Sequence, residues 1–184
     1  MESTRIQIPD ELFAPAESSH FEGEYQIDRL EVGPDEYVFC GPLSWQVDVT
    51  NTGEAFLVMG TVEGEAVTLC GRCLEEVRVT LGGEVDGYYL IDPASAEDLE
   101  DMEGDEFDVL GEDDVIDIEG PIRAALLLEI PLVPLCDEDC KGLCLSCGSN
   151  LNEGPCDCEP VEEVEEEEPA NNPFAVLKSL KLDD

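Results

Sequence analysis

Hydrophobic and polar residues alternate along the first half of the chain, a pattern typical of β-strands with one buried face. Trp45, Val47 and Val49 alternate with the polar residues between them. The same two-residue period recurs at residues 6–8, 25–27, 37–39, 67–69, 77–81 and 85–91, and shorter strand candidates lie at 107–110 and 115–118. Residues 55–62 are apolar on both faces, which predicts a fully buried strand.

Glycine, proline and asparagine separate these strands. Gly33-Pro34-Asp35 and Asn51-Thr52-Gly53-Glu54 predict turns, the second of them a hairpin turn. Gly64 is expected to break the apolar run, and Gly82-Gly83 is expected to turn the chain into the next strand. Strands that follow one another at such short spacing predict an antiparallel sheet that can curl into a barrel.

One helix is predicted after the sheet, near residues 121–130. Pro121 suits the first helical position, and Pro131 ends the helix. Residues 126–130 are apolar nearly all round, so we expect this helix to be buried against the sheet. The predicted fold class is α+β, mainly an antiparallel β-sheet with one buried helix.

Cysteine gathers after the helix, since six of the nine cysteines fall within residues 136–158. Cys144-Leu-Ser-Cys147-Gly148 has the form of a metal knuckle, in which two thiolates face one ion and the glycine lets backbone amides approach the sulfurs. A tetrahedral site needs a second pair, which either Cys136 and Cys140 or Cys156 and Cys158 can supply. Zn²⁺ is the default ion for such a site, and iron is less expected. The alternative without metal is a loop stapled by disulfides.

A second motif, Cys70-Gly-Arg-Cys73, lies at a strand end. Strands flank it on both sides, whereas a redox C-x-x-C of the thioredoxin type sits between a strand and a helix. Half of a metal site is therefore preferred over a redox dithiol, a disulfide or two packed thiols. This half-site either joins the downstream cluster or holds its own ion with a distant pair.

One or two zinc ions are thus expected. The predicted metal ligands are Cys70, Cys73, Cys136, Cys140, Cys144, Cys147, Cys156 and Cys158. Cys40 stands alone and is expected to be a buried small hydrophobic residue. His20 is the only histidine and has no acid–base partner nearby in the sequence, so no catalytic residue is predicted.

Composition divides the chain into five parts. They are an N-terminal segment (1–23), a β-rich domain (24–135), the cysteine-rich segment (136–158), an acidic linker (159–171) and a C-terminal amphipathic helix (172–184). Within the second part, the acidic stretch 92–106 is expected to be a mobile loop. Phe174, Leu177 and Leu180 line one side of the last helix, which either docks back onto the domain or enters a groove of a partner.

The charge is extreme, since 47 acidic and 8 basic residues give a formal net charge of −39. Binding to nucleic acid normally rests on Lys and Arg, so direct RNA contact is disfavoured outside a local patch. The charge favours a basic partner, such as a ribosomal protein or an assembly factor; the alternative is a surface that serves solubility alone. No stretch approaches the ~20 apolar residues of a membrane span, and the first residues lack an apolar run of signal length. A cytoplasmic protein with no membrane contact and no small-molecule substrate is expected.

Several motifs together resemble a known family. They are Cys70-Gly-Arg-Cys73-Leu-Glu75, Ile116-Asp-Ile118, Leu128-Glu-Ile-Pro-Leu132, the stretch from Cys136 to Asn152, and Asn172-Pro-Phe-Ala-Val-Leu-Lys-Ser-Leu180. In these motifs the chain resembles the bacterial YceD family of large ribosomal RNA subunit accumulation proteins. The resemblance implies a non-enzymatic role in accumulating 23S rRNA and in making the large ribosomal subunit. The competing interpretation is a thiol oxidoreductase that uses Cys70 and Cys73, or an iron-binding electron carrier that uses the downstream cysteines.

Overall fold

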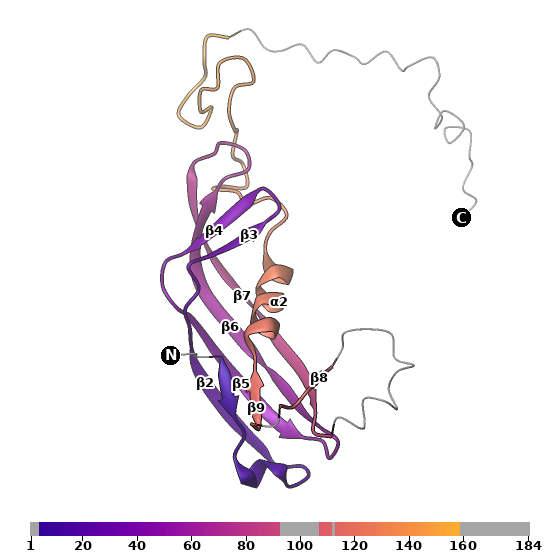
Figure 1. Ribbon diagram of the computed structural model, residues 1–184. Helices are drawn as coiled ribbons and strands as arrows, with labels where there is room; N and C mark the ends of the chain where they lie inside the picture. Colours follow the sequence, from indigo (N-terminus) through magenta and orange to yellow (C-terminus); the bar gives the residue numbers. More distant parts are fainter. Residues whose placement is uncertain (1–3, 93–106, 112, 159–184) are drawn as a thin grey trace, which may run out of the picture.

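The computed structural model describes residues 4–92, 107–111 and 113–158 of the chain (Figure 1). Its elements, in chain order, are β1 (Arg5–Gln7), the 3-10 helix η1 (Asp10–Phe13), β2 (Ser18–Tyr25), β3 (Arg29–Val32), β4 (Asp35–Phe39), β5 (Leu43–Asn51), β6 (Ala55–Leu69), β7 (Glu76–Leu90), β8 (Asp108–Val109), β9 (Val115–Asp117) and α2 (Glu119–Glu129). The predicted α+β class is therefore confirmed, with a mainly antiparallel sheet and one α-helix among the described residues.

A long hairpin of β6 and β7 is the centre of the sheet. The two strands pair from Ala55 with Leu90 to Leu69 with Glu76, over 15 residues in each strand. The other edge of β6 is shared, because β5 pairs with its first half and β4 pairs near its end. The seven-stranded sheet stays open, with β2 and β3 at the two ends of the main path, so the predicted curl into a barrel is not confirmed.

Two glycine predictions were wrong, because Gly64 and the Gly82-Gly83 pair lie inside these long strands. The glycines allow close packing instead of turns. A Cβ at Gly64 would lie 2.3 Å from Leu43 Cδ2, and a Cβ at Gly83 would lie 2.6 Å from the carbonyl oxygen of Ala125. Turns were correctly predicted where they join strands, at residues 33–35 and 51–54.

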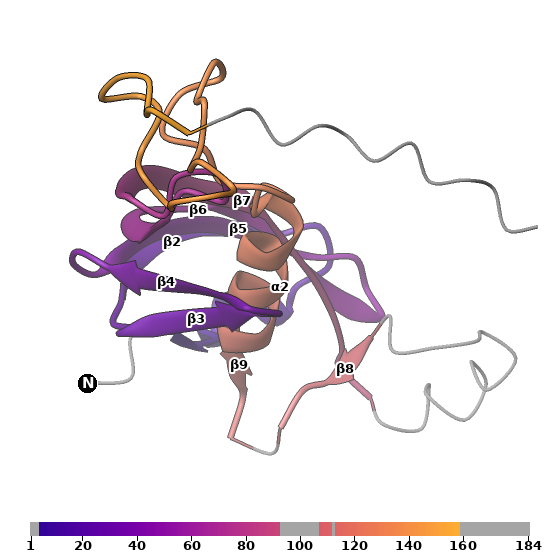
Figure 2. The same cartoon turned by 90° about the horizontal axis from the view of Figure 1, so that it is seen from above.

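The helix α2 lies across one face of the sheet, over β7 and β6 (Figure 2). Ile122, Ala125 and Leu126 are buried there, and the helix ends before Pro131 as expected. The expected burial against the sheet is confirmed for this side of the helix, whereas the side chains of Leu127 and Leu128 on its other side are 46% and 84% exposed. The helix rests on the sheet through one side only, so apolar residues on its outer side face solvent.

The N-terminal residues belong to the same core. The alternation at residues 6–8 correctly predicted a strand, β1, which pairs with β9, and β2 pairs with β5 along its full length. Ile6, Ile8 and Leu12 are buried in the cluster that also holds Trp45. The expected division between residues 23 and 24 falls inside β2, so the chain gives no separate N-terminal unit in this region.

Three predictions fall on residues that the structure does not describe: nearly all of the acidic loop (93–106), the linker (159–171) and the C-terminal helix (172–184). In the part of the chain that is described, none of the helices has the length and apolar character needed to cross a membrane.

Candidate metal centre

The tip of the β6–β7 hairpin carries Cys70 and Cys73. The backbone N–H of Leu74 donates to the Cys70 carbonyl over 2.9 Å, and the Cys70 N–H donates to the Glu75 carbonyl over 2.8 Å. Leu74 takes up a left-handed conformation with φ of 61°. The tight turn directs both cysteine side chains to one side of the tip, where Cys70 and Cys73 are 0% and 3% exposed.

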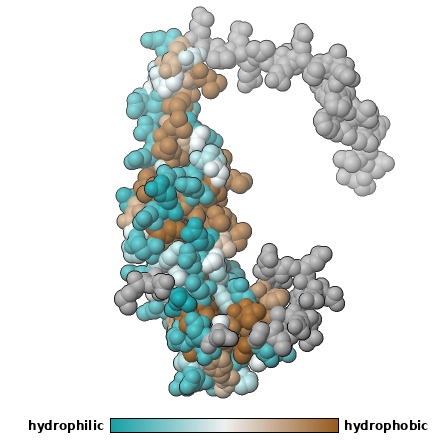
Figure 3. All heavy atoms as spheres, in the orientation of Figure 1, coloured by the Kyte–Doolittle hydropathy of each residue, from teal (hydrophilic) through white to brown (hydrophobic). Residues whose placement is uncertain are grey.

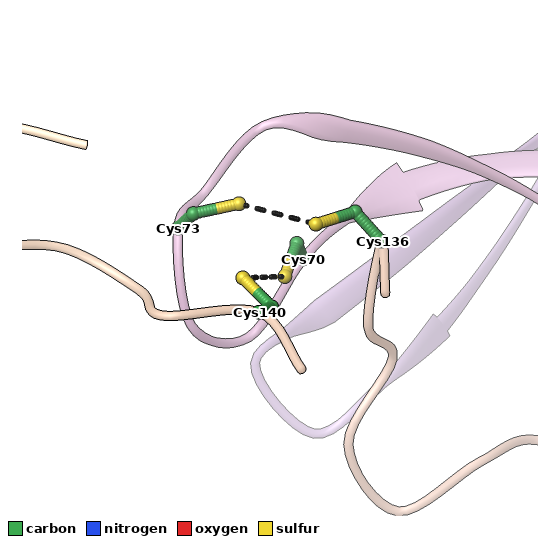
Figure 4. Close-up of side chains that lie close together, drawn as sticks. All are labelled: Cys70, Cys73, Cys136 and Cys140. Carbon is green, nitrogen blue, oxygen red and sulfur yellow. Dashed lines mark hydrogen bonds between the residues drawn. The ribbon is translucent and has the colours of Figure 1, made fainter. Parts of the chain in front are cut away.

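Cys136 and Cys140 complete this site, which we call the proximal cluster (Figure 4). The Sγ atoms of Cys70 and Cys140 are 3.8 Å apart, and those of Cys73 and Cys136 are 3.6 Å apart. A disulfide would need about 2.05 Å. Four thiolates at ~2.3 Å around one tetrahedral zinc ion have sulfurs roughly 3.8 Å apart. The spacing therefore fits a bound metal ion and does not fit disulfides.

Cys144, Cys147, Cys156 and Cys158 form a second group, the distal cluster, whose sulfurs also lie within 4.8 Å of one another. Its knuckle repeats the turn of the hairpin tip. The Gly148 N–H donates to the Cys144 carbonyl over 2.8 Å, and Gly148 has φ of 73°. The same backbone conformation thus occurs at Leu74 and at Gly148, one residue after the second cysteine of each motif.

The connector after α2 brings Cys136 and Cys140 to the hairpin. The Gly71 N–H donates to the Pro134 carbonyl over 2.8 Å. The guanidinium of Arg72 donates to the carbonyls of Glu138 and Cys140 over 3.0 and 2.9 Å. These bonds fix the second half of the proximal cluster against the first, although more than 60 residues separate them in sequence.

Hydrogen bonds favour the thiolate form of one sulfur in each cluster, Cys70 and Cys147, whereas hydrogen bonds from neighbouring thiols raise the pKa of Cys136 and of Cys158 to about 12. Burial alone would raise the pKa of Cys70, but backbone hydrogen bonds from the segments of Cys73, Cys136 and Arg72 outweigh it and lower this pKa to about 6. In the distal cluster, the hydroxyl and the backbone of Ser149 lower the pKa of Cys147 to about 6. Because the thiolate is the form that binds metal, each cluster contains a sulfur prepared to coordinate an ion near neutral pH.

All eight predicted cysteines lie in the two clusters. The structure pairs the knuckle of Cys144 and Cys147 with Cys156 and Cys158, and it gives Cys70 and Cys73 a distant pair of their own. Both were among the alternatives that the sequence allowed. The burial expected for Cys40 was wrong, because this thiol is exposed, just beyond the end of β4. It is outside both clusters.

Sequence reasoning missed two residues that organise the site. The sequence could have indicated Arg72, since it lies between Cys70 and Cys73 and is one of only 8 basic residues in the chain. Nothing in the sequence indicated a role for Asn152. Its side-chain oxygen accepts a 2.8 Å hydrogen bond from the Lys141 N–H. Asparagine is so common in loops that its type and position alone do not indicate such a contact.

Known proteins are similar to parts of the chain, and a family model matches across both clusters. The family model described as large ribosomal RNA subunit accumulation protein YceD matches residues 58–181. An uncharacterized protein of Mycobacterium tuberculosis is 38% identical over 115 residues, which cover 61% of this chain and 53% of the relative. A protein of Arabidopsis thaliana named large ribosomal RNA subunit accumulation protein YCED homolog 1, chloroplastic, is 54% identical over 43 residues, 23% of this chain and 13% of the relative.

A relative in Mycobacterium leprae is 36% identical over 116 residues, 60% of this chain and 49% of the relative. The chain therefore spans about half the length of these mycobacterial relatives. No solved structure matches the chain.

Proposed function

The chain belongs to the YceD family of large ribosomal RNA subunit accumulation proteins, and from this membership we propose that it supports the accumulation of 23S rRNA and the assembly of the large ribosomal subunit. The observation that carries the proposal is the family match over residues 58–181, which contains most of the long hairpin and both cysteine clusters. We place this role in the cytoplasm, where thiols stay reduced and free to bind metal.

The chain acts by binding and not by catalysis, and its partner is a basic protein of the ribosome or of its assembly. The net charge of −39 supports this, because such a surface repels the phosphates of RNA and attracts lysine- and arginine-rich proteins. An acidic protein can keep a basic ribosomal protein soluble until it meets rRNA, and so act on rRNA indirectly.

Each cluster holds one zinc ion in this proposal. Two sets of four cysteine sulfurs support it, because zinc in structural sites prefers closed tetrahedral thiolate sets. A bound ion would cross-link the hairpin tip to the segment after α2, a region with little apolar core of its own. The same ligand set suits iron, so the alternative is an iron-binding or thiol redox protein. Visible absorption of the pure protein reveals iron, since zinc thiolates are colourless, and metal analysis separates a zinc protein from a thiol redox protein without metal.

The test is a deletion of the gene in its own host. We expect the ratio of 23S to 16S rRNA to fall and large subunits to decrease on sucrose gradients, and the wild-type chain to restore both. A Cys73→Ser chain should restore less than a Cys40→Ser chain, because only Cys73 belongs to a cluster. An unchanged rRNA ratio in the deletion strain would rule out the proposed function.

A further inference from the structure

A groove of about 660 Å³ lies where the C-terminal end of α2 meets the long hairpin. Ala125, Leu128 and Glu129 form its helical side, and its other side comes from the middle of β6 and β7. Among the described strands, β7 pairs on its outer side only at Tyr89 and Leu90, with β8. Residues 82–86 therefore leave an open strand edge beside the groove, as far as the described residues show.

Carboxylates surround the groove. Its lining includes Glu63, Glu84, Asp86 and Glu129, and no lysine or arginine. Glu84 and Asp86 flank the buried Val85, so they lie on the sheet face turned away from α2 and border the groove from the other side of the open β7 edge. Together with Glu129 on the helix they give this edge a negative potential, which attracts cationic groups.

The same groove also contains an exposed apolar side chain that is not part of the hydrophobic core. Leu128 lines it and is 84% exposed. The apolar surface continues along the connector through Leu132 and Val133, which are 99% and 55% exposed. Figure 3 shows hydrophobic surface gathered over α2 and the segment that leads from it toward the cysteine clusters. A contiguous exposed apolar patch with polar residues at its rim marks an interaction site.

We propose that this groove is the docking site for an amphipathic, lysine- or arginine-rich segment of a partner protein. An apolar residue of that segment packs on Leu128, and its cations pair with Glu84, Asp86 and Glu129. The proposal rests on the proposed function in taking the partner to be a basic protein, and it adds where on this chain that partner binds.

Other occupants fit the groove less well. RNA offers phosphates to a surface lined by carboxylates, and a second copy of the chain would bring its own large negative charge. The chain's own residues 172–182 combine apolar residues with Lys178 and Lys181, so they are the competitor that the experiment must exclude.

The experiment measures binding of a fluorescent synthetic peptide to the full, zinc-loaded chain. The peptide carries leucines at helical spacing on one side and lysines on the other, and a scrambled peptide has the same composition. At ~0.15 M salt the screening length is about 8 Å, so distant charges contribute little. We expect the amphipathic peptide to bind about tenfold more tightly than the scrambled one, and Leu128→Ser to remove that advantage.

Matched control variants distinguish peptide binding in the groove from a general attraction to the negative charge of the chain. Glu84→Lys with Glu129→Lys should weaken binding about tenfold, whereas Glu22→Lys with Glu24→Lys, the same charge change on β2, should have little effect. Leu145→Ser, which removes an equally exposed leucine of the distal knuckle, should bind like the wild type. Equal losses in the groove and control variants would overturn the proposal.

Three further outcomes decide the remaining questions. If Leu177→Ser shifts the Leu128 methyl resonance without added peptide, the chain's own C-terminal segment occupies the groove and the proposal is wrong. Groove variants that lose the peptide but restore 23S rRNA in the deletion strain overturn the docking site and leave the proposed function standing. Groove-specific binding with an unchanged rRNA ratio in the deletion strain overturns only the proposed function.

Discussion

The side-chain amide of Asn152 donates a hydrogen bond to Cys140 Sγ over 3.2 Å. Asn152 lies between Cys147 and Cys156, two cysteines of the distal cluster, whereas Cys140 belongs to the proximal cluster. The oxygen of the same amide accepts from the Lys141 N–H over 2.8 Å, which fixes the amide orientation. A loop of the distal cluster thus supplies a hydrogen-bond donor to a sulfur of the proximal cluster.

Replacing Asn152 by alanine should therefore weaken metal binding in the proximal cluster, although Asn152 is not a ligand. Loss of a hydrogen bond to a ligand atom commonly lowers metal affinity 10- to 100-fold, and we expect about tenfold here. Zinc competition with a chromophoric chelator measures it. Glu153→Ala, a neighbouring exposed residue, is the control, and equal affinities in the two variants would contradict the role of Asn152.

Metal removal should proceed in two steps. The distal cysteines are half-buried or exposed, whereas Cys70, Cys73 and Cys140 are at most 4% exposed and only Cys136 of the proximal cluster is exposed. A chelator should thus extract one zinc ion quickly and the second slowly, as counted by native mass spectrometry. The far-ultraviolet signal of the sheet should persist throughout, because the main core does not include the cysteines. The prediction would be contradicted if both ions left together, or if the far-ultraviolet signal of the sheet disappeared when the first ion was removed.

The knuckle glycine should be sensitive to substitution because of its backbone conformation alone. At Gly148 a Cβ would meet no atom within 4 Å, yet its φ is 73°. An L-residue in this region costs about 1–2 kcal/mol, so Gly148→Ala should weaken zinc binding in the distal cluster roughly tenfold. Gly41→Ala is the matched control, since Gly41 has equal space and no positive φ. Equal zinc affinity in both variants would show that the turn adapts freely.

Local patterns predicted the local features well. The hairpin turn at residues 51–54, the helix that begins around Pro121 and the eight clustered cysteines could all be inferred from short stretches of sequence. The pairing of Cys73 with Cys136 could not, because it depends on how a connector 60 residues away folds over the hairpin tip. Gly64 and Gly83 were misread for a related reason. Glycine also serves where two segments approach closely, and only the tertiary structure shows which segments do.

Tyr89 should make the protein less stable at alkaline pH. Burial, together with the negative charges of Asp108 and Asp117, raises the pKa of Tyr89. The unfolded chain loses this proton above pH ~10, whereas the folded chain keeps it. The stability it contributes is thus present below about pH 10 and is lost as the pH rises toward the folded pKa. Urea unfolding should show a smaller alkaline loss for Tyr89→Phe than for the wild type, and an identical loss would contradict this assignment.

The same variant has a cost at neutral pH. The Tyr89 hydroxyl donates to the Asp117 carbonyl over 2.9 Å, which ties β7 to the end of β9. Removing the hydroxyl leaves that carbonyl without this partner, so Tyr89→Phe should lower the free energy of unfolding by about 1 kcal/mol.

Gly83 should set how closely α2 approaches the sheet, and with it the shape of the acidic groove. A Cβ at this position would lie 2.6 Å from the carbonyl oxygen of Ala125 and 2.9 Å from its carbonyl carbon, and backbone atoms cannot rotate away as a flexible side chain can. Gly83→Ala must therefore move the helix or the strand, which typically costs about 1–3 kcal/mol of unfolding free energy. The same movement should weaken peptide binding in the groove, because Ala125, Leu128 and Gly83 line it together. Gly41→Ala again serves as the control in urea unfolding, and an unchanged midpoint for Gly83→Ala would mean that the helix does not rest on this glycine.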